Sequence, residues 1–137
     1  MRPVYETDEN RAQEEKISTY LADKWGCEVA KMPLRYEVDR VFLKDGKPVA
    51  WVEIKRRKRT LMQFDTVWLG AHKAVMGINL SKLSGLPFFY ALGCNDCVAY
   101  IKIEGVYDMR FGGRKDRGDW QDMEPVLEIP SQNFTMI

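Results

Sequence analysis

The feature that most constrains this chain is a pair of apolar, β-branched segments joined by a tight turn. Residues 36–43 read YEVDRVFL and residues 49–55 read VAWVEIK. Both favour strands, because β-branched and aromatic side chains fit a pleated surface. Between them, residues 44–48 read KDGKP, and Asp-Gly at the centre of such a segment favours a hairpin turn. The sequence therefore predicts a β-hairpin over residues 36–55.

The segments around this hairpin predict an α/β fold. Residues 10–25 are expected to form a helix, because Ile17, Leu21 and Trp25 recur every four residues. A second helix is expected over residues 64–83, with one apolar face formed by Phe64, Trp68, Ala71, Val75 and Ile78. The other expected elements are strands at 27–32, 86–93, 98–103 and 125–129, and a long loop at 105–122. The order αβββαββ predicts a mixed central β-sheet flanked by helices.

Length and charge narrow the class of protein. The 137 residues suit a single domain over 1–137. With 21 Lys+Arg against 20 Asp+Glu, the net charge of +1 argues against a polycation that coats nucleic acid by bulk charge. No stretch approaches the length of a membrane span, and the N-terminus MRPVYETDEN lacks the apolar core of a signal peptide. A cytoplasmic protein that contacts no membrane is therefore expected.

The cysteines do not predict a disulfide framework, because there are three of them. Cys94 and Cys97 have CxxC spacing, but a structural zinc needs four ligands. The remaining soft ligands, Cys27 and the single His72, lie far away in the sequence. A turn with two half-buried thiols is the favoured interpretation.

The hairpin brings ionisable side chains together. If it closes symmetrically about Gly46, Leu43 faces Val49 and Asp39 faces Glu53, with the two acids on one face of the sheet. Carboxylates that close need a proton or a cation between them, and a hard divalent cation such as Mg²⁺ fits. Lys55, two residues beyond Glu53, projects from the same face. Salt bridges on a solvated face are the alternative, and a one-residue slip would separate the acids.

These residues resemble the PD-(D/E)XK nuclease superfamily, also called the restriction-endonuclease-like fold. The match is Asp39, a gap of thirteen residues, and then Glu53-Ile54-Lys55. It covers about residues 10–103 and is similar to small phage-type and Holliday-junction-resolvase-like members. Val38 stands where the motif has Pro, and inactive members of this fold exist.

The resemblance implies a divalent-metal-dependent DNA endonuclease that hydrolyses phosphodiester bonds with Mg²⁺ or Mn²⁺. Carried over, Asp39 and Glu53 would be metal ligands and Lys55 the catalytic lysine. Related members carry a further Glu on the first helix, and Glu14 fits that position as catalytic residue and metal ligand. Glu14 shares the face of Ile17 and Leu21, whereas Glu15 lies about 100° round the helix. The alternative for Glu14 is an acid favoured by the helix dipole.

Two basic segments are candidates for DNA contacts. The run Arg56, Arg57, Lys58 and Arg59 follows Lys55 directly and would contact phosphates flanking the cut. Its alternative is a solvated or localisation-type patch. The second candidate is the loop bearing Arg110, Arg114, Lys115 and Arg117, which could equally be a dimer contact or a flexible loop. Lys73 lies off the apolar face of the second helix, and the superfamily sometimes uses a polar residue there.

The expected partner is DNA, and the structure of that DNA stays open between junction, flap, single strand and duplex. A homodimer would suit a resolvase, because two coordinated cuts need two sites. The family likeness suggests phage origin, and therefore the host cell cytoplasm. The alternative function is a non-catalytic nucleic-acid-binding or assembly module on a nuclease-like fold.

Overall fold

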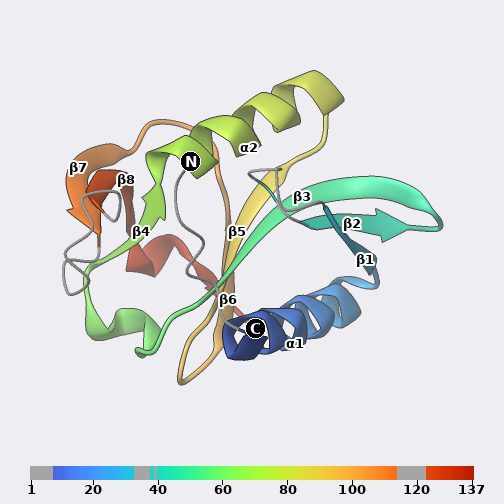
Figure 1. Cartoon of the computed structure of the whole chain (residues 1–137), viewed down its shortest axis with the longest axis horizontal. Coiled ribbons are helices and arrows are strands. Elements are labelled where there is room, and N and C mark those ends of the chain that lie inside the picture. Colours follow the sequence, from blue (N-terminus) through green and yellow to red (C-terminus); the bar gives the residue numbers. More distant parts are fainter. Residues whose placement is uncertain (1–7, 33–37, 39, 114–122) are drawn as a thin grey trace.

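The computed structural model describes residues 8–32, 38, 40–113 and 123–137. Within them the chain forms two β-sheets and two α-helices (Figure 1). Neither helix is long and apolar enough to cross a membrane. The elements, in chain order, are α1 (Asp8–Trp25), β1 (Glu28–Lys31), β2 (Arg40–Lys44), β3 (Lys47–Arg56), the 3-10 helix η1 (Leu61–Gln63), β4 (Thr66–Gly70), α2 (Ala71–Ser84), β5 (Phe88–Gly93), β6 (Val98–Lys102), β7 (Asp108–Gly113), β8 (Met123–Pro130), the 3-10 helix η3 (Ser131–Asn133) and β9 (Thr135–Met136).

The larger sheet is mixed and has the strand order β1-β2-β3-β5-β6-β9. Its central neighbours β3 and β5 are parallel, and the other neighbouring strands are antiparallel. Helix α1 contacts β1, β3 and β5, and α2 contacts β3 and β5. Figure 1 shows the two helices on opposite sides of this sheet. The predicted α/β fold with a mixed central sheet between helices is therefore confirmed.

Strand β3 divides its side chains between two cores. Val52 and Ile54 pack with Ile17 and Leu21 of α1, whereas Trp51 packs into the core that contains residues of α2, β4 and β5. Because successive side chains of a strand point to opposite faces, Glu53 and Lys55 share the face of Trp51. The predicted common face of these two residues follows from this alternation.

The hairpin forms, and its register contains a bulge. Asp45 and Gly46 both have positive φ (52° and 74°), as in the two-residue turns that match strand twist. Leu43 consequently pairs with Pro48, so the expected pairing with Val49 is wrong. One extra residue in β3 then forms a β-bulge. Beyond it Arg40 pairs with Val52, which is the register predicted for this end of the hairpin.

The expected helix over residues 64–83 is wrong in its first third. Residues 66–70 form strand β4, which pairs antiparallel with β8, and the helix begins only at Ala71. In β4 burial alternates, with Val67 and Leu69 buried, so period-two packing against a partner strand overrides the four-residue spacing. Of the predicted apolar face, Phe64 (57%) and Val75 (54%) are exposed.

The expected loop over residues 105–122 contains strand β7, which pairs with β8 in the small sheet β4-β8-β7. The glycines of this segment suggested a loop, but Gly112 lies in a strand because its position is closely packed against another residue. A Cβ at Gly112 would lie 2.9 Å from the Trp68 ring of β4, so only glycine allows this close approach. Residues 114–122 lie outside the described part of the chain.

Candidate active site

Glu53 is the acid at the centre of the candidate site. Its Cα pairs with that of Tyr90 in β5, in the parallel ladder at the middle of the large sheet. The residue is only 2% exposed. A carboxylate this deeply buried is costly unless a cation or hydrogen bonds compensate it.

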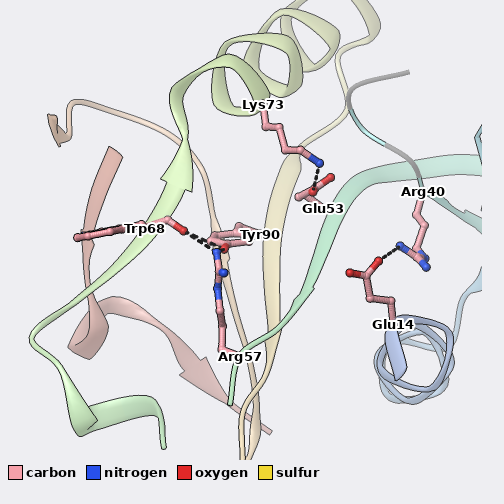
Figure 2. Close-up of polar contacts among 7 residues, drawn as sticks. All are labelled: Glu14, Arg40, Glu53, Arg57, Trp68, Lys73 and Tyr90. Carbon is pink, nitrogen blue, oxygen red and sulfur yellow. Dashed lines mark hydrogen bonds and ion pairs between the residues drawn. The ribbon is translucent and has the colours of Figure 1, made fainter. Parts of the chain in front are cut away.

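Lys73 of α2 supplies a positive charge to Glu53. Its Nζ lies 2.8 Å from Oε2 of Glu53, and Figure 2 shows the side chain reaching from the helix toward the strand. Salt bridges of the hairpin acids on a solvated face were the alternative. Glu53 is buried rather than solvated, and one of its partners, Lys73, belongs to another element.

Lys55 lies in the same electrostatic neighbourhood. Burial, followed by the charge of Lys73, lowers the pKa of the Lys55 ammonium, and the charges of Glu53 and Glu14 oppose this change. The charges of Glu14 and Glu53, two residues that the sequence predicted for the same site, therefore both act on Lys55. Lys55 is held in place by the pairing of its backbone position with Leu92 of β5.

Glu14 is on the buried face of α1, at 8% exposure. Nη1 of Arg40 lies 3.8 Å from its Oε1, and Figure 2 shows the two side chains facing each other. The adjacent Glu15 is 54% exposed and lies 3.4 Å from Nη2 of the same guanidinium. The prediction that Glu14 occupies the packed face is confirmed, while its role as ligand stays a prediction.

The basic run after Lys55 makes many contacts within the protein. Arg57 donates hydrogen bonds to Tyr90 Oη (2.9 Å) and the Trp68 carbonyl (3.2 Å), as Figure 2 shows. Arg56 donates to the Gly93 carbonyl and Asn95 Oδ1, and Arg59 donates to the Leu61, Phe64 and Thr66 carbonyls. Lys58 is the exposed member of the run. The arginines therefore fix the end of β3 against β4 and the following loops.

The CxxC segment serves this same region. Cys94 N donates to the Cys97 carbonyl across a turn. Asp96 Oδ1 accepts from the Leu61 amide, and the Asn95 amide donates to the Arg59 carbonyl. Cys94 and Cys97 are free, half-buried thiols, as expected for a structural turn.

Several predicted site residues lie outside the described part of the chain. They are Asp39, Arg114, Lys115 and Arg117. Among the residues that are described, no group of three or more His, Cys, Asp or Glu side chains could hold a metal. Arg110 is described, and it stacks over Trp68 and pairs with Glu128.

Sequence reasoning predicted neither the contact of Lys73 with Glu53 nor the burial of Arg40 beside Glu14. One feature of the sequence could have indicated that Lys73 faces the sheet, namely Gly77, four residues later. Gly77 packs against the Phe88 ring so closely that a Cβ would clash, which places this side of α2 against the sheet and Lys73 one turn away on it. Arg40 has no such signal, because an arginine in a strand is usually assigned to a solvated face.

The family of the chain follows from a match along its whole length. Residues 1–137 match the family described as "Phage putative PDDEXK endonuclease". The chain belongs to this family of phage PD-(D/E)XK endonucleases, and the resemblance carried by Asp39, Glu53 and Lys55 is confirmed at that level. No curated protein sequence matches the chain.

A solved structure with a similar fold is that of Hjc, a Holliday junction resolvase from the archaeal hyperthermophile Archaeoglobus fulgidus. The TM-score is 0.57 over 91% of this chain and 92% of that one, at 13% sequence identity. At this identity the likeness shows the fold. Family and fold together support a DNA endonuclease.

Proposed function

We propose that this protein is a divalent-metal-dependent endonuclease that hydrolyses phosphodiester bonds in DNA. The observation that carries the proposal is the buried Glu53, on the strand face it shares with Lys55, a lysine on which the charges of both Glu53 and Glu14 act. Glu14 and Glu53 are both buried, near the lysines Lys55 and Lys73. Burying charged groups costs stability. A cation and a phosphate are the ligands that would use such a site.

The donor set fits Mg²⁺ or Mn²⁺. Glu14 and Glu53 offer hard carboxylate oxygens, and each already faces a cationic side chain, Arg40 and Lys73. Asp39 is proposed as the third acid. The register of the hairpin supports this proposal, because Arg40, the residue after Asp39, lies opposite Val52, the residue before Glu53. When bound, the metal would acidify a water and neutralise charge on the phosphate.

Lys55 is proposed to touch the reacting phosphate or to orient the attacking water. Its strand position is fixed by the central parallel ladder, so its ammonium acts as a placed point charge. Lys55 is partly buried, and a partly buried charge interacts with an anion more strongly than a charge in bulk water does.

For DNA contacts, Lys58 is the member of the basic run that is exposed, and we assign it to a phosphate flanking the cut. Arg56, Arg57 and Arg59 hold the strand end that presents it, through the hydrogen bonds described above. Arg114, Lys115 and Arg117 remain proposed contacts of a second segment. Loss of Lys58 should weaken binding to all sequences alike.

Branched DNA is the substrate we propose, with the fold shared with a Holliday junction resolvase as its support. Two coordinated cuts on a four-way junction need two active sites, which a homodimer would provide. The phage family assignment supports action in the cytoplasm of a host cell.

A non-catalytic DNA-binding module is the second candidate. The observation that favours it is the pairing of both acids with cationic side chains, Glu14 with Arg40 and Glu53 with Lys73, which a purely structural role would also produce. Such a protein would bind DNA in a salt-dependent way without any metal.

The two candidates are separated by cleavage assays on four-way junction, flap, single-stranded and linear DNA. The nuclease is expected to cut with Mg²⁺ or Mn²⁺ and not with a chelator, and Asp39→Asn to lose the activity. Glu15→Gln is the matched control for Glu14→Gln, because it alters an exposed acid one residue away. Salt-dependent DNA binding without cleavage, and no calorimetric signal at millimolar metal, would instead establish the binding module.

A further inference from the structure

Lys73 places a positive charge directly on the acid at the centre of the site. It belongs to the first turn of α2, and its Nζ is 2.8 Å from Glu53 Oε2. The Glu53 side chain is 2% exposed, whereas that of Lys73 is 37% exposed. The pair thus joins a buried carboxylate to a lysine whose side chain is partly exposed.

We propose that Lys73 takes the place of the divalent cation at Glu53 in the metal-free protein and, once the cation displaces it, contacts a DNA phosphate beside the cut. This inference rests on the proposed role of Glu53 as a metal ligand. It adds a second lysine, from a different element, to the proposed chemistry of Lys55.

The first step follows from charge balance at a buried carboxylate. Glu53 needs a positive neighbour, and Lys73 supplies it. A divalent cation on the same carboxylate would lie within a few ångströms of the ammonium, where like charges repel strongly in a partly buried setting. Lysine can withdraw, because its ammonium is a point charge on a flexible stem.

The second step follows from where a displaced Lys73 would remain. Its backbone is anchored in α2, which packs against β3 and β5. Its charge is already felt at Lys55, whose pKa it lowers second only to burial. An ammonium that leaves Glu53 therefore stays beside the site. There an incoming phosphate would supply a new negative partner for Lys73, because the Glu53 carboxylate would be neutralised by the metal.

The test is calorimetric titration of the full-length chain with Mn²⁺, comparing wild type with Lys73→Met. Lys82→Met is the matched control, because Lys82 is an exposed lysine in the last turn of the same helix. We expect Lys73→Met to bind Mn²⁺ about tenfold more tightly or better, since a competing charge is gone, and Lys82→Met to match wild type. Equal or weaker binding by Lys73→Met would overturn the displacement.

A second measurement follows the released lysine. At saturating Mn²⁺, single-turnover cleavage by Lys73→Met should fall about tenfold or more, as expected when a charge on the transition state is lost. A rate equal to wild type would overturn the phosphate contact. Failure of the proposed function looks different, because wild type itself would then show no Mn²⁺ binding, or binding that Glu53→Gln leaves unchanged.

Discussion

Nζ of Lys73 lies 2.8 Å from Oε2 of Glu53, so a helix on one face of the large sheet neutralises an acid buried in its central strand. The neighbouring Lys55 carries a second ammonium, whose pKa burial and Lys73 lower. The site therefore holds opposed charges in close quarters even without a ligand.

Removal of Lys73 should destabilise the metal-free protein. Lys73→Met leaves Glu53 without its 2.8 Å partner, and a loss of about 1–3 kcal/mol is expected for a buried group deprived of a partner. Glu53→Gln in the same chain should restore part of that loss, giving a coupling energy of about 0.5–3 kcal/mol. Urea denaturation in the presence of a chelator measures the free energy of unfolding of wild type, the two single variants and the double variant. Losses of stability that simply add in the double variant would contradict the ion pair.

Arg40 should be more important to stability than any surface arginine. It is 1% exposed and faces Glu14 and Glu15, so Arg40→Met is expected to cost about 3–5 kcal/mol, the range for breaking a buried ion pair. Glu15→Gln, at an exposed position, should cost about 0–1 kcal/mol. Wild-type thermal stability of Arg40→Met would contradict a stabilising buried ion pair between Arg40 and Glu14.

Gly77→Ala should destabilise the protein although alanine favours helices. The helix gains about 1 kcal/mol from the substitution, but the new Cβ would meet the Phe88 ring, and overpacking costs about 1–3 kcal/mol. Asn79→Ala, at an exposed position of the same helix, should slightly stabilise. A higher denaturation midpoint for Gly77→Ala would show that Phe88 moves aside freely.

Cys97 should react slowly with alkylating agents near neutral pH. Burial, followed by the charge of Asp96, raises the pKa of its thiol from the ordinary value of 9.0 to about 11. The folded state holds the proton more tightly than the unfolded state, so the stability this thiol contributes is present below pH 9.0 and is lost as the pH rises through about 11.

Mass-spectrometric mapping of iodoacetamide modification from pH 7 upward checks this prediction. The folded Cys97 should lag behind the same residue in urea-unfolded protein at every pH below its own pKa. Identical pH profiles for the folded and unfolded chains would contradict it.

The hairpin shows how far sequence reasoning reached. Its segments and its Asp45–Gly46 turn were predictable, because β-branched residues and Asp-Gly have strong local preferences. The bulge was not predictable, since no residue type in this segment indicates it. The turn alone would set Arg40 opposite Trp51, and the bulge sets it opposite Val52. The predicted register of the site end was thus correct for a reason that the sequence does not show.

The misassigned segments depended on distant partners. Residues 66–70 became strand β4 because β8, some sixty residues later, offers an edge to pair with. Strand β7 became part of the same sheet because Gly112 fits against Trp68. The contact of Lys73 with Glu53 was not predicted for the same reason, since the helix that carries Lys73 begins at Ala71 and places it over Glu53. The helix face that carries Glu14 and the strand face that carries Glu53, by contrast, were predictable from the local periodicity of the sequence.

The most direct test is the single-turnover cleavage rate of a four-way junction with Mn²⁺, measured for wild type and Lys55→Ala. Cleavage by wild type that stops on chelation, with a loss of about 100-fold or more in the variant, is predicted for a charge that acts on the transition state. Equal cleavage by the two proteins, or none by either on any DNA, would contradict a metal-dependent nuclease site built on Glu53 and Lys55.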